Sequence, residues 1–262
     1  MPVSKLVRVF FTLQILMNAW HVNAQQDVVQ HASCQLSVRV ESEQQSIAAG
    51  SHNNSQLSQH SYQLLSALLA TLPCQMNTVA LPAGRAIKML EEGSLAVMIA
   101  MSETPERAQY SYFVGPHHIE RMVAVGRRDL EHRVTDLFQL LSMRGLISVT
   151  EGAYYGPQWQ QLLQQDALID QRIFYASVNQ QKLAMLASDR VIASLEDEVI
   201  VDELLRQGDM ASRYVKLFVL HENPVYFAFS RNAISKDIYQ QLQLNWQHML
   251  DSGEVDKIRQ NL

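Results

Sequence analysis

The sequence lacks the short motifs that mark several common enzyme classes. It contains no GxSxG, GxxxxGK or HExxH pattern, which argues against a serine hydrolase, a phosphate-loop enzyme and a zinc protease. It has only two cysteines and no CxxC pair. Beyond the first 24 residues no apolar run approaches the ~20 residues that a membrane-spanning helix needs. The sequence therefore offers no motif for these enzyme classes and no second candidate for a membrane span.

The first 24 residues have the pattern of a secretory signal peptide. Lys5 and Arg8 precede a mostly apolar run, and Val22 and Ala24 have the small-residue spacing that signal peptidase recognises. A retained membrane anchor is the alternative, although polar residues interrupt the short run. Cleavage after Ala24 changes the net charge from −5 to −7 because two basic residues and no acids are lost. We therefore expect a periplasmic protein that binds no nucleic acid.

The two cysteines, Cys34 and Cys74, both remain after this cleavage. An even number of cysteines in an oxidising compartment favours a disulfide over a metal site or a catalytic thiol. Two free buried thiols are the alternative.

Short apolar runs alternate with helical patterns, which is typical of an α/β protein with a largely parallel sheet. We predict a polar surface loop over 48–60, and Ser61, Thr104 and Ser235 as residues that start helices. Gly93 is expected to end a helix and Gly253 to break the last one. The predicted strands are 36–40, 76–81, 95–101, 112–114, 121–125, 146–150, 172–176, 191–195, 216–220 and 225–230. The predicted helices are 61–70, 84–92, 136–141, 156–165, 179–187, 199–207 and a long one after 235.

Three segments, in order and at the expected spacing, resemble the amino-acid-binding class of extracellular solute-binding proteins, the two-lobed receptors that feed ABC transporters. They read LPAGRAIKMLEEGSLAVMIAMSETPERAQYSYFVGP at 81–116, DLFQLLSMRGLISVTEGAYYG at 136–156 and PVYFAFSRNAISKDIYQQLQLNWQHMLDSGEVDKI at 224–258. Each motif is weak alone, and their order carries the resemblance.

The resemblance implies a two-lobed periplasmic binding protein-like fold of type II, in which two α/β lobes with mainly parallel sheets are joined by two hinge strands. Lobe 1 would comprise 25–125 plus 225–262, and lobe 2 would comprise 126–224. The hinge strands would lie near 123–126 and 221–226, and ligand would bind in the cleft between the lobes. Cys34 and Cys74 would lie at the ends of neighbouring strands, which suits a disulfide.

The resemblance also implies which residues hold the ligand. Arg107 would bind the ligand's carboxylate, and Ser102 would add a hydrogen bond. Without the resemblance, Arg107 is interpreted as a surface charge. Asp197 would hold the ligand's ammonium, with Glu196 and Glu198 as neighbours, although three consecutive acids are also typical of a solvated helix start.

Further candidates lie on other loops. Glu41 is a second candidate for the ammonium. In the turn 150–156, backbone N–H groups could face an anion, and Tyr154 or Tyr155 would line the cleft or else pack in the core. His117 and His118 occupy positions where relatives carry aromatic cleft residues. Because adjacent side chains point in different directions, we expect them to share no metal, and we expect no cofactor.

Three departures from the family pattern count against an ordinary amino-acid ligand. The stretch 42–49 has no aromatic residue to stack on a ligand, Ala83 replaces a common tryptophan, and Ile192 stands where aspartate is usual.

These features lead to three hypotheses. The first is a monomeric periplasmic protein, without catalysis, that captures an amino acid or other small carboxylate for a membrane permease. The second is a sensory module that reports the ligand to a membrane partner. The third is a periplasmic dehydratase of cyclohexadienyl acids, which would need a general acid such as Glu41, Glu151 or His117.

Overall fold

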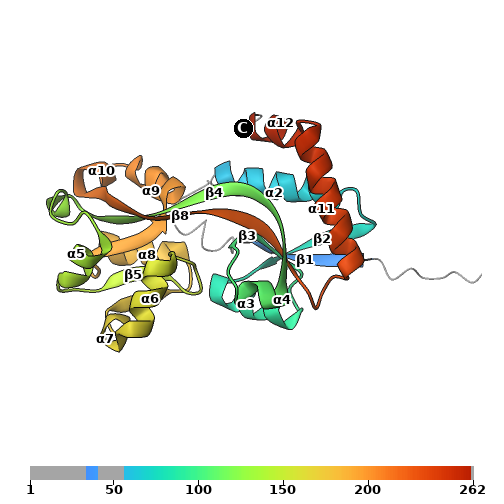
Figure 1. Cartoon of the computed structure of the whole chain (residues 1–262). Helices are drawn as coiled ribbons and strands as arrows, with labels where there is room; N and C mark the ends of the chain where they lie inside the picture. The colour runs from blue at the N-terminus through green and yellow to red at the C-terminus, as the bar shows by residue number, and fades with distance from the viewer. Residues whose placement is uncertain (1–33, 41–55, 261–262) are drawn as a thin grey trace, which may run out of the picture. The chain divides into compact units, whose positions relative to one another are not determined.

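The computed structural model describes residues 34–40 and 56–260 (Figure 1). The predicted signal peptide and Glu41 lie outside these ranges, as does the part of the predicted polar loop before residue 56. The rest of that loop is helical, which corrects the prediction. None of the helices within the described ranges combines the length and apolar character needed to cross a bilayer.

In the described residues, eight strands form one hydrogen-bonded sheet in the order β2-β1-β3-β8-β4-β7-β5-β6. Two groups, β2-β1-β3 and β7-β5-β6, are parallel, and they flank the antiparallel pair of β8 and β4. The α/β class is therefore confirmed. The strands are β1 (Cys34–Val40), β2 (Cys74–Ala80), β3 (Val97–Ser102), β4 (Ser111–Arg127), β5 (Ile147–Thr150), β6 (Ile173–Ala176), β7 (Ala193–Asp197) and β8 (Tyr214–Ser230).

Strands β4 and β8 are longer than the sequence predicted. Each runs for 17 residues and joins two predicted strands that were separated by a presumed break. The two strands hydrogen-bond to one another along most of their length, with irregular register between Val114 and His118 and again near Met122. Because of this pairing, the sheet is continuous and is not divided into two (Figure 1).

Most predicted helices occur, with shifted ends. Ser61 does not start its helix: α2 begins five residues earlier, and Ser61 is buried within it. The helical elements are α2 (Gln56–Leu69), α3 (Ala83–Glu92), α4 (Arg107–Tyr110), η1 (Arg128–Leu130), α5 (Leu137–Ser142), α6 (Pro157–Gln165), α7 (Ala167–Asp170), α8 (Asn179–Ala187), α9 (Glu198–Leu205), α10 (Met210–Arg213), α11 (Lys236–Asp251) and α12 (Glu254–Gln260).

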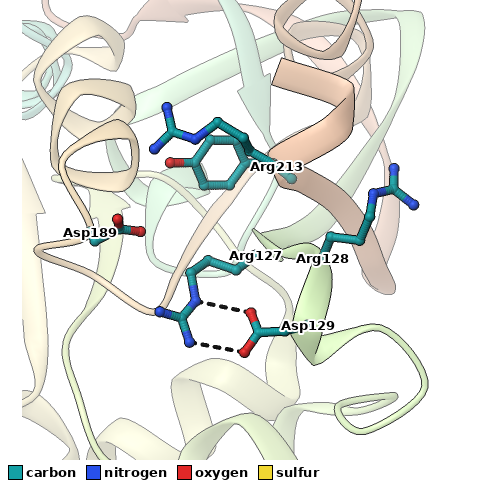
Figure 2. A pocket seen from close by; sticks show the side chains of 6 residues that line it. Arg127, Arg128, Asp129, Asp189 and Arg213 are labelled. Carbon is teal, nitrogen blue, oxygen red and sulfur yellow. Dashed lines mark hydrogen bonds and ion pairs between the residues drawn. The ribbon is translucent and has the colours of Figure 1, made fainter. Parts of the chain in front are cut away.

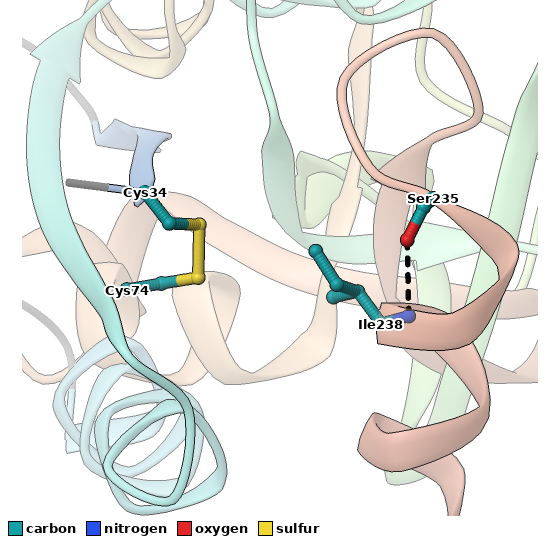
Figure 3. Close-up of a disulfide and its surroundings, with 4 residues drawn as sticks. All are labelled: Cys34, Cys74, Ser235 and Ile238. Carbon is teal, nitrogen blue, oxygen red and sulfur yellow. Dashed lines mark hydrogen bonds between the residues drawn. A yellow bond between two sulfur atoms is a disulfide. The ribbon is translucent and has the colours of Figure 1, made fainter. Parts of the chain in front are cut away.

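The predicted helix boundaries that rest on a specific backbone requirement are confirmed. Gly93 ends α3 with φ of 85°, a left-handed conformation that glycine adopts without strain. The hydroxyl of Ser235 accepts a hydrogen bond from the backbone N–H of Ile238 at the start of α11 (Figure 3). Gly253, with φ of 71°, separates α11 from α12.

Separate apolar clusters bury the two parallel groups of strands. One contains Leu64, Leu65, Leu68 and Leu69 of α2, the face that the sequence predicted, packed with β1, β3, β8 and α11. Another joins β4, β5 and β7 to α5 and α6.

Cys34 and Cys74 form a disulfide, as predicted (Figure 3). They are the first residues of β1 and β2, stand opposite one another in the parallel register and have Cα atoms 4.4 Å apart. The bond spans 40 residues, so the loop-entropy model assigns it about 3 to 4 kcal/mol.

Candidate functional site

Arg107 connects the segment after β3 to the turn after β5. Its backbone N–H bonds to the hydroxyl of Thr104, the cap that the sequence predicted. The guanidinium donates to the carbonyl oxygens of Ser102 and Gly152, each at 2.9 Å. A guanidinium has five N–H donors, so others remain for a ligand.

No acid among the described residues forms an ion pair with Arg107. Burial lowers its pKa, while Tyr110 and Glu120 act in the opposite direction. Within 34–40 and 56–260, no carboxylate lies within ion-pair distance of the guanidinium. Because an arginine stays protonated at neutral pH, this partly buried cation is suited to an anionic ligand.

Of the two candidate tyrosines, only Tyr154 lies beside Arg107. Its ring centre is 5.9 Å from the guanidinium carbon, and its ring meets the edge of His221 at 5.5 Å. The hydroxyl of the buried Tyr155 accepts from the N–H of Thr150 at 2.7 Å and lies 3.4 Å from the carbonyl oxygen of Leu195. Tyr155 is therefore a core residue.

The three consecutive acids at the end of β7 have different surroundings. Glu196 forms a buried ion pair with Lys182 at 2.7 Å. Glu198 pairs with Arg121 and Lys216, each at 2.8 Å. Asp197 accepts a hydrogen bond from the N–H of Val199 at 2.9 Å and has no ion-pair partner among the described side chains.

The surroundings of Asp197 also change its ionisation. Burial raises its pKa to about 6, opposed by the N–H of Val199 and reinforced by Glu196 and Glu198. A cationic group placed beside it would favour the ionised form, so Asp197 is suited to an ammonium.

Glu120 belongs to the same cluster, although the sequence analysis did not select it. In β4, Met122 stands opposite Asp197, and Glu120 is two residues away on the same face. Burial, then Asp197 and Glu196, raise the pKa of Glu120 to about 8, while Arg107 and Lys182 oppose the shift. Glu120 could have been found from one signal: it is a carboxylate within β4, a strand that runs between the two parallel groups of strands.

The structure does not bring His117 to this cluster. Its side chain is 3% exposed, and its ring stacks on Phe227 with centres 4.2 Å apart. Its Nε2 lies 2.7 Å from the carbonyl oxygen of Ile99, and its Nδ1 lies 3.4 Å from the hydroxyl of Ser61. Burial lowers the pKa of His117 to about 4. The structure thus gives His117 a packing position, contrary to the expectation that it lines a cleft.

The remaining predicted residues are distributed as follows. Ser102 is buried at the end of β3 and supplies the carbonyl described above. Glu151 is exposed and lies against Gly84 of α3. Glu41 lies outside the described residues. In the described part of the chain, no group of three or more His, Cys, Asp or Glu side chains is arranged to hold a metal ion.

A pocket of about 360 Å³ lies elsewhere, around three arginines (Figure 2). Arg127 makes two hydrogen bonds to Asp129, each 3.0 Å long, as Figure 2 shows. Arg128 pairs with Glu131, and the guanidinium of Arg213 lies over the ring of Tyr214. Arg127 and Arg128 are thus paired with carboxylates, whereas Arg213, like Arg107, contacts a ring and a backbone carbonyl oxygen, that of Ala187.

Searches with family models and with curated protein sequences find no match for the chain. Among solved structures, a mutant of ArgBP from T. maritima is similar at 16% identity and a TM-score of 0.66, covering 87% of this chain and 94% of that one. A histidine kinase sensor domain with similarity to periplasmic binding proteins has 13% identity and a TM-score of 0.68, covering 87% and 95%.

A third similar structure is AbpA from Streptococcus pneumoniae, an amino acid ABC transporter substrate-binding protein bound to L-arginine. It is 14% identical, with a TM-score of 0.67, over 87% of this chain and 93% of that one. The chain therefore has the type II periplasmic binding protein-like fold that its motifs resemble.

Proposed function

We propose that the chain is a periplasmic solute-binding protein that captures a small ligand carrying both a carboxylate and an ammonium group. Arg107 and the hydroxyl of Ser102 bind the carboxylate, and Asp197 accepts hydrogen bonds from the ammonium. Tyr154 covers the ligand beside Arg107. Glu41 is a further proposed contact to the ammonium.

The same proposal includes the organisation inferred from the sequence. The signal peptide is removed after Ala24, and the mature chain is a monomer without catalytic activity. Lobe 1 comprises 25–125 plus 225–262, lobe 2 comprises 126–224, and the lobes close over the ligand. A membrane permease then receives the ligand.

One observation carries this proposal: Arg107 and Asp197 lack ion-pair partners among the described residues, and both lie close enough to Glu120 to affect its ionisation. A cation without an acid and an acid without a base, held in one cluster, are suited to a ligand that has the opposite charges at its two ends. The similarity to an amino-acid-binding structure supports the same assignment.

A thermal-shift screen against amino acids, opines and small carboxylates tests the proposal. A true ligand stabilises the protein by RT ln(1 + [L]/Kd), ~2.7 kcal/mol at a hundredfold excess over Kd. Prephenate and arogenate belong in the same screen, with release of an aromatic product as the readout for a dehydratase. Absence of stabilisation by every compound would count against the solute-binding proposal.

Arg107→Ala tests the site itself. Loss of a charge-assisted contact to the carboxylate should weaken binding about 100-fold, ~2 to 3 kcal/mol. Arg127→Ala is the matched control, because it removes an arginine whose charge is already paired. Equal ligand binding by the two variants would show that the assignment of Arg107 is wrong.

A sensory role is the second candidate, favoured by the similarity to a histidine kinase sensor domain. It predicts that deletion of the gene leaves uptake of the ligand unchanged but abolishes ligand-dependent gene expression. Transport predicts the reverse, so measurement of both in the same strain separates the two roles.

A further inference from the structure

The proposed ligand contacts use Arg107 at one end of the ligand and Asp197 at the other. They do not use the carboxylate of Glu120. It is partly buried on β4, with Asn223 of β8 directly opposite. Within residues 34–40 and 56–260, no hydrogen bond or ion pair links its carboxylate to another side chain. A second acid is thus held beside Asp197 without a counter-charge.

The charged groups around Glu120 come from three other elements. Strand β7 contributes Asp197 and Glu196, both acidic, while α8 contributes Lys182 and α4 contributes Arg107. Lys182 is already paired with Glu196, and Arg107 donates to two backbone carbonyls. Neither cation forms an ion pair with Glu120, although both favour its ionised form from a distance.

Strand β8 presents two further side chains next to Glu120. His221 stands opposite Met122, and burial lowers its pKa, so it is neutral at pH 7. Asn223 donates through Nδ2 to the carbonyl of Pro224. Its Oδ1 is buried and has no hydrogen-bond partner in the described part of the chain. A buried acceptor without a donor is unfavourable, and a ligand N–H group would correct it.

We propose that Glu120 and the side-chain oxygen of Asn223 form a subsite for a cationic nitrogen of the ligand beside Asp197, and that filling this subsite displaces a proton from Glu120 to solvent. This inference rests on the proposed solute-binding function and adds a specificity-determining residue to it. The displaced proton makes capture of the ligand sensitive to pH.

The sign of this coupling follows from the acid's ionisation. With a pKa of about 8, Glu120 carries a proton at pH 7 in the free protein. A cationic nitrogen binds the ionised carboxylate, so the ligand and the proton compete. The affinity should therefore rise about tenfold per pH unit between pH 6.5 and 7.5, where Asp197, with a pKa of about 6, is already largely ionised.

Isothermal titration of the wild-type protein measures the proton directly. L-Arginine, L-lysine, L-glutamine and succinate are titrated at pH 7 in phosphate and in Tris, whose ionisation enthalpies differ. We expect an amino acid that binds to release close to one proton, and succinate, which has no cationic nitrogen, to release none. Binding of an amino acid with no proton release would overturn the inference.

Two matched variants assign the proton to its residue. Glu120→Gln should bind the amino acid about tenfold or more weakly at pH 8 and lose both the proton release and the pH dependence. Glu222→Gln should retain them, because Glu222 pairs with Arg121, whose charge is already shared with Glu198.

The outcomes separate this inference from the function on which it rests. If none of the amino acids binds the wild-type protein, the proposed function fails and the inference fails with it. If an amino acid binds and Glu120→Gln keeps the wild-type affinity and proton release, the inference alone is wrong.

Discussion

Arg107 and the arginines of the pocket in Figure 2 carry the same charge but have different surroundings. In the pocket, Arg127 has a carboxylate partner at 3.0 Å, and Arg128 has one at 3.1 Å. Arg107 instead bonds only to two carbonyl oxygens and a neighbouring ring. The contrast therefore holds between Arg107 and the pair Arg127 and Arg128, because Arg213 also contacts a ring and a carbonyl oxygen.

Two neighbouring acids, Glu196 and Asp197, show the same contrast between a paired and an unpaired charge. Glu196 is neutralised by Lys182 inside the protein, while Asp197, the next residue, has no cation beside it. The proposed site therefore rests on partly buried charges without ion-pair partners, and not on the size of a pocket or the number of charged side chains. Variants that pair, unpair or remove these charges test this distinction.

The largest effect is expected from Lys182→Met, which leaves the buried Glu196 without its partner. Breaking a buried ion pair costs about 3 to 5 kcal/mol of unfolding free energy. Urea denaturation measures it. Adding Glu196→Gln to the same chain should restore much of the loss, and a double variant as unstable as the single one would contradict the ion-pair explanation.

Acidification of the wild-type protein is expected to lower its unfolding free energy by about 3 kcal/mol, because of His117. Its pKa is about 4 in the folded state against 6.5 in the unfolded state, so the unfolded chain binds a proton first as the pH falls. The contribution of neutral His117 to the unfolding free energy should be complete above pH 6.5 and should be lost as the pH falls from 6.5 to 4. His117→Phe should flatten the unfolding free energy over this range, and an unchanged slope would show that other groups cause it.

A gain of about 2 kcal/mol in unfolding free energy is expected for Glu120→Gln at pH 9, less than the ~5 kcal/mol that the full pKa shift represents, because the side chain is partly exposed. A raised pKa means that the folded state holds a proton longer than the unfolded state, so wild-type stability falls as the pH rises from 4.5 to 8. Glutamine removes this fall. Denaturation at pH 5 and pH 9 should show the variant equal to wild type at the lower pH and more stable at the higher one.

The smallest effect is expected from Arg127→Gln, at most about 0.5 kcal/mol. Its ion pair with Asp129 is about half exposed on both sides, where such pairs contribute little. A destabilisation above 1 kcal/mol in the same urea assay would show that the pocket has a structural role that its exposed ion pair does not explain.

Much of the fold could be predicted because its signals are local. Gly93, Ser235 and the leucine face of α2 each act within a few residues, and the structure confirms all three. The continuity of β4 and β8 could not be predicted, since polar residues such as Glu120 and Glu222 interrupt the apolar pattern. Those interruptions are tolerated because the backbone groups of β4 and β8 hydrogen-bond to one another along the antiparallel pair.

The candidate site divides in the same way. Arg107 and Asp197 followed from motif order and remain a prediction, supported by the influence of both on the ionisation of Glu120. Tyr154 could be preferred over Tyr155 only once the hydrogen bonds of the Tyr155 hydroxyl were known. His117 could be assigned to the core only from its stacking on Phe227. Glu120 was missed because its importance comes from β7, which is distant in sequence and adjacent only after the sheet has formed.

The disulfide at the first residues of β1 and β2 has a consequence for association between molecules. Among the described strands, β2 lies at one end of the sheet, with one edge facing no other strand. Such an edge can be exchanged for the matching strand of another chain. Because Cys74 is covalently tied to Cys34, β2 cannot leave β1 entirely while the bond is intact. The cross-link therefore limits strand exchange between molecules at this edge while the bond is intact.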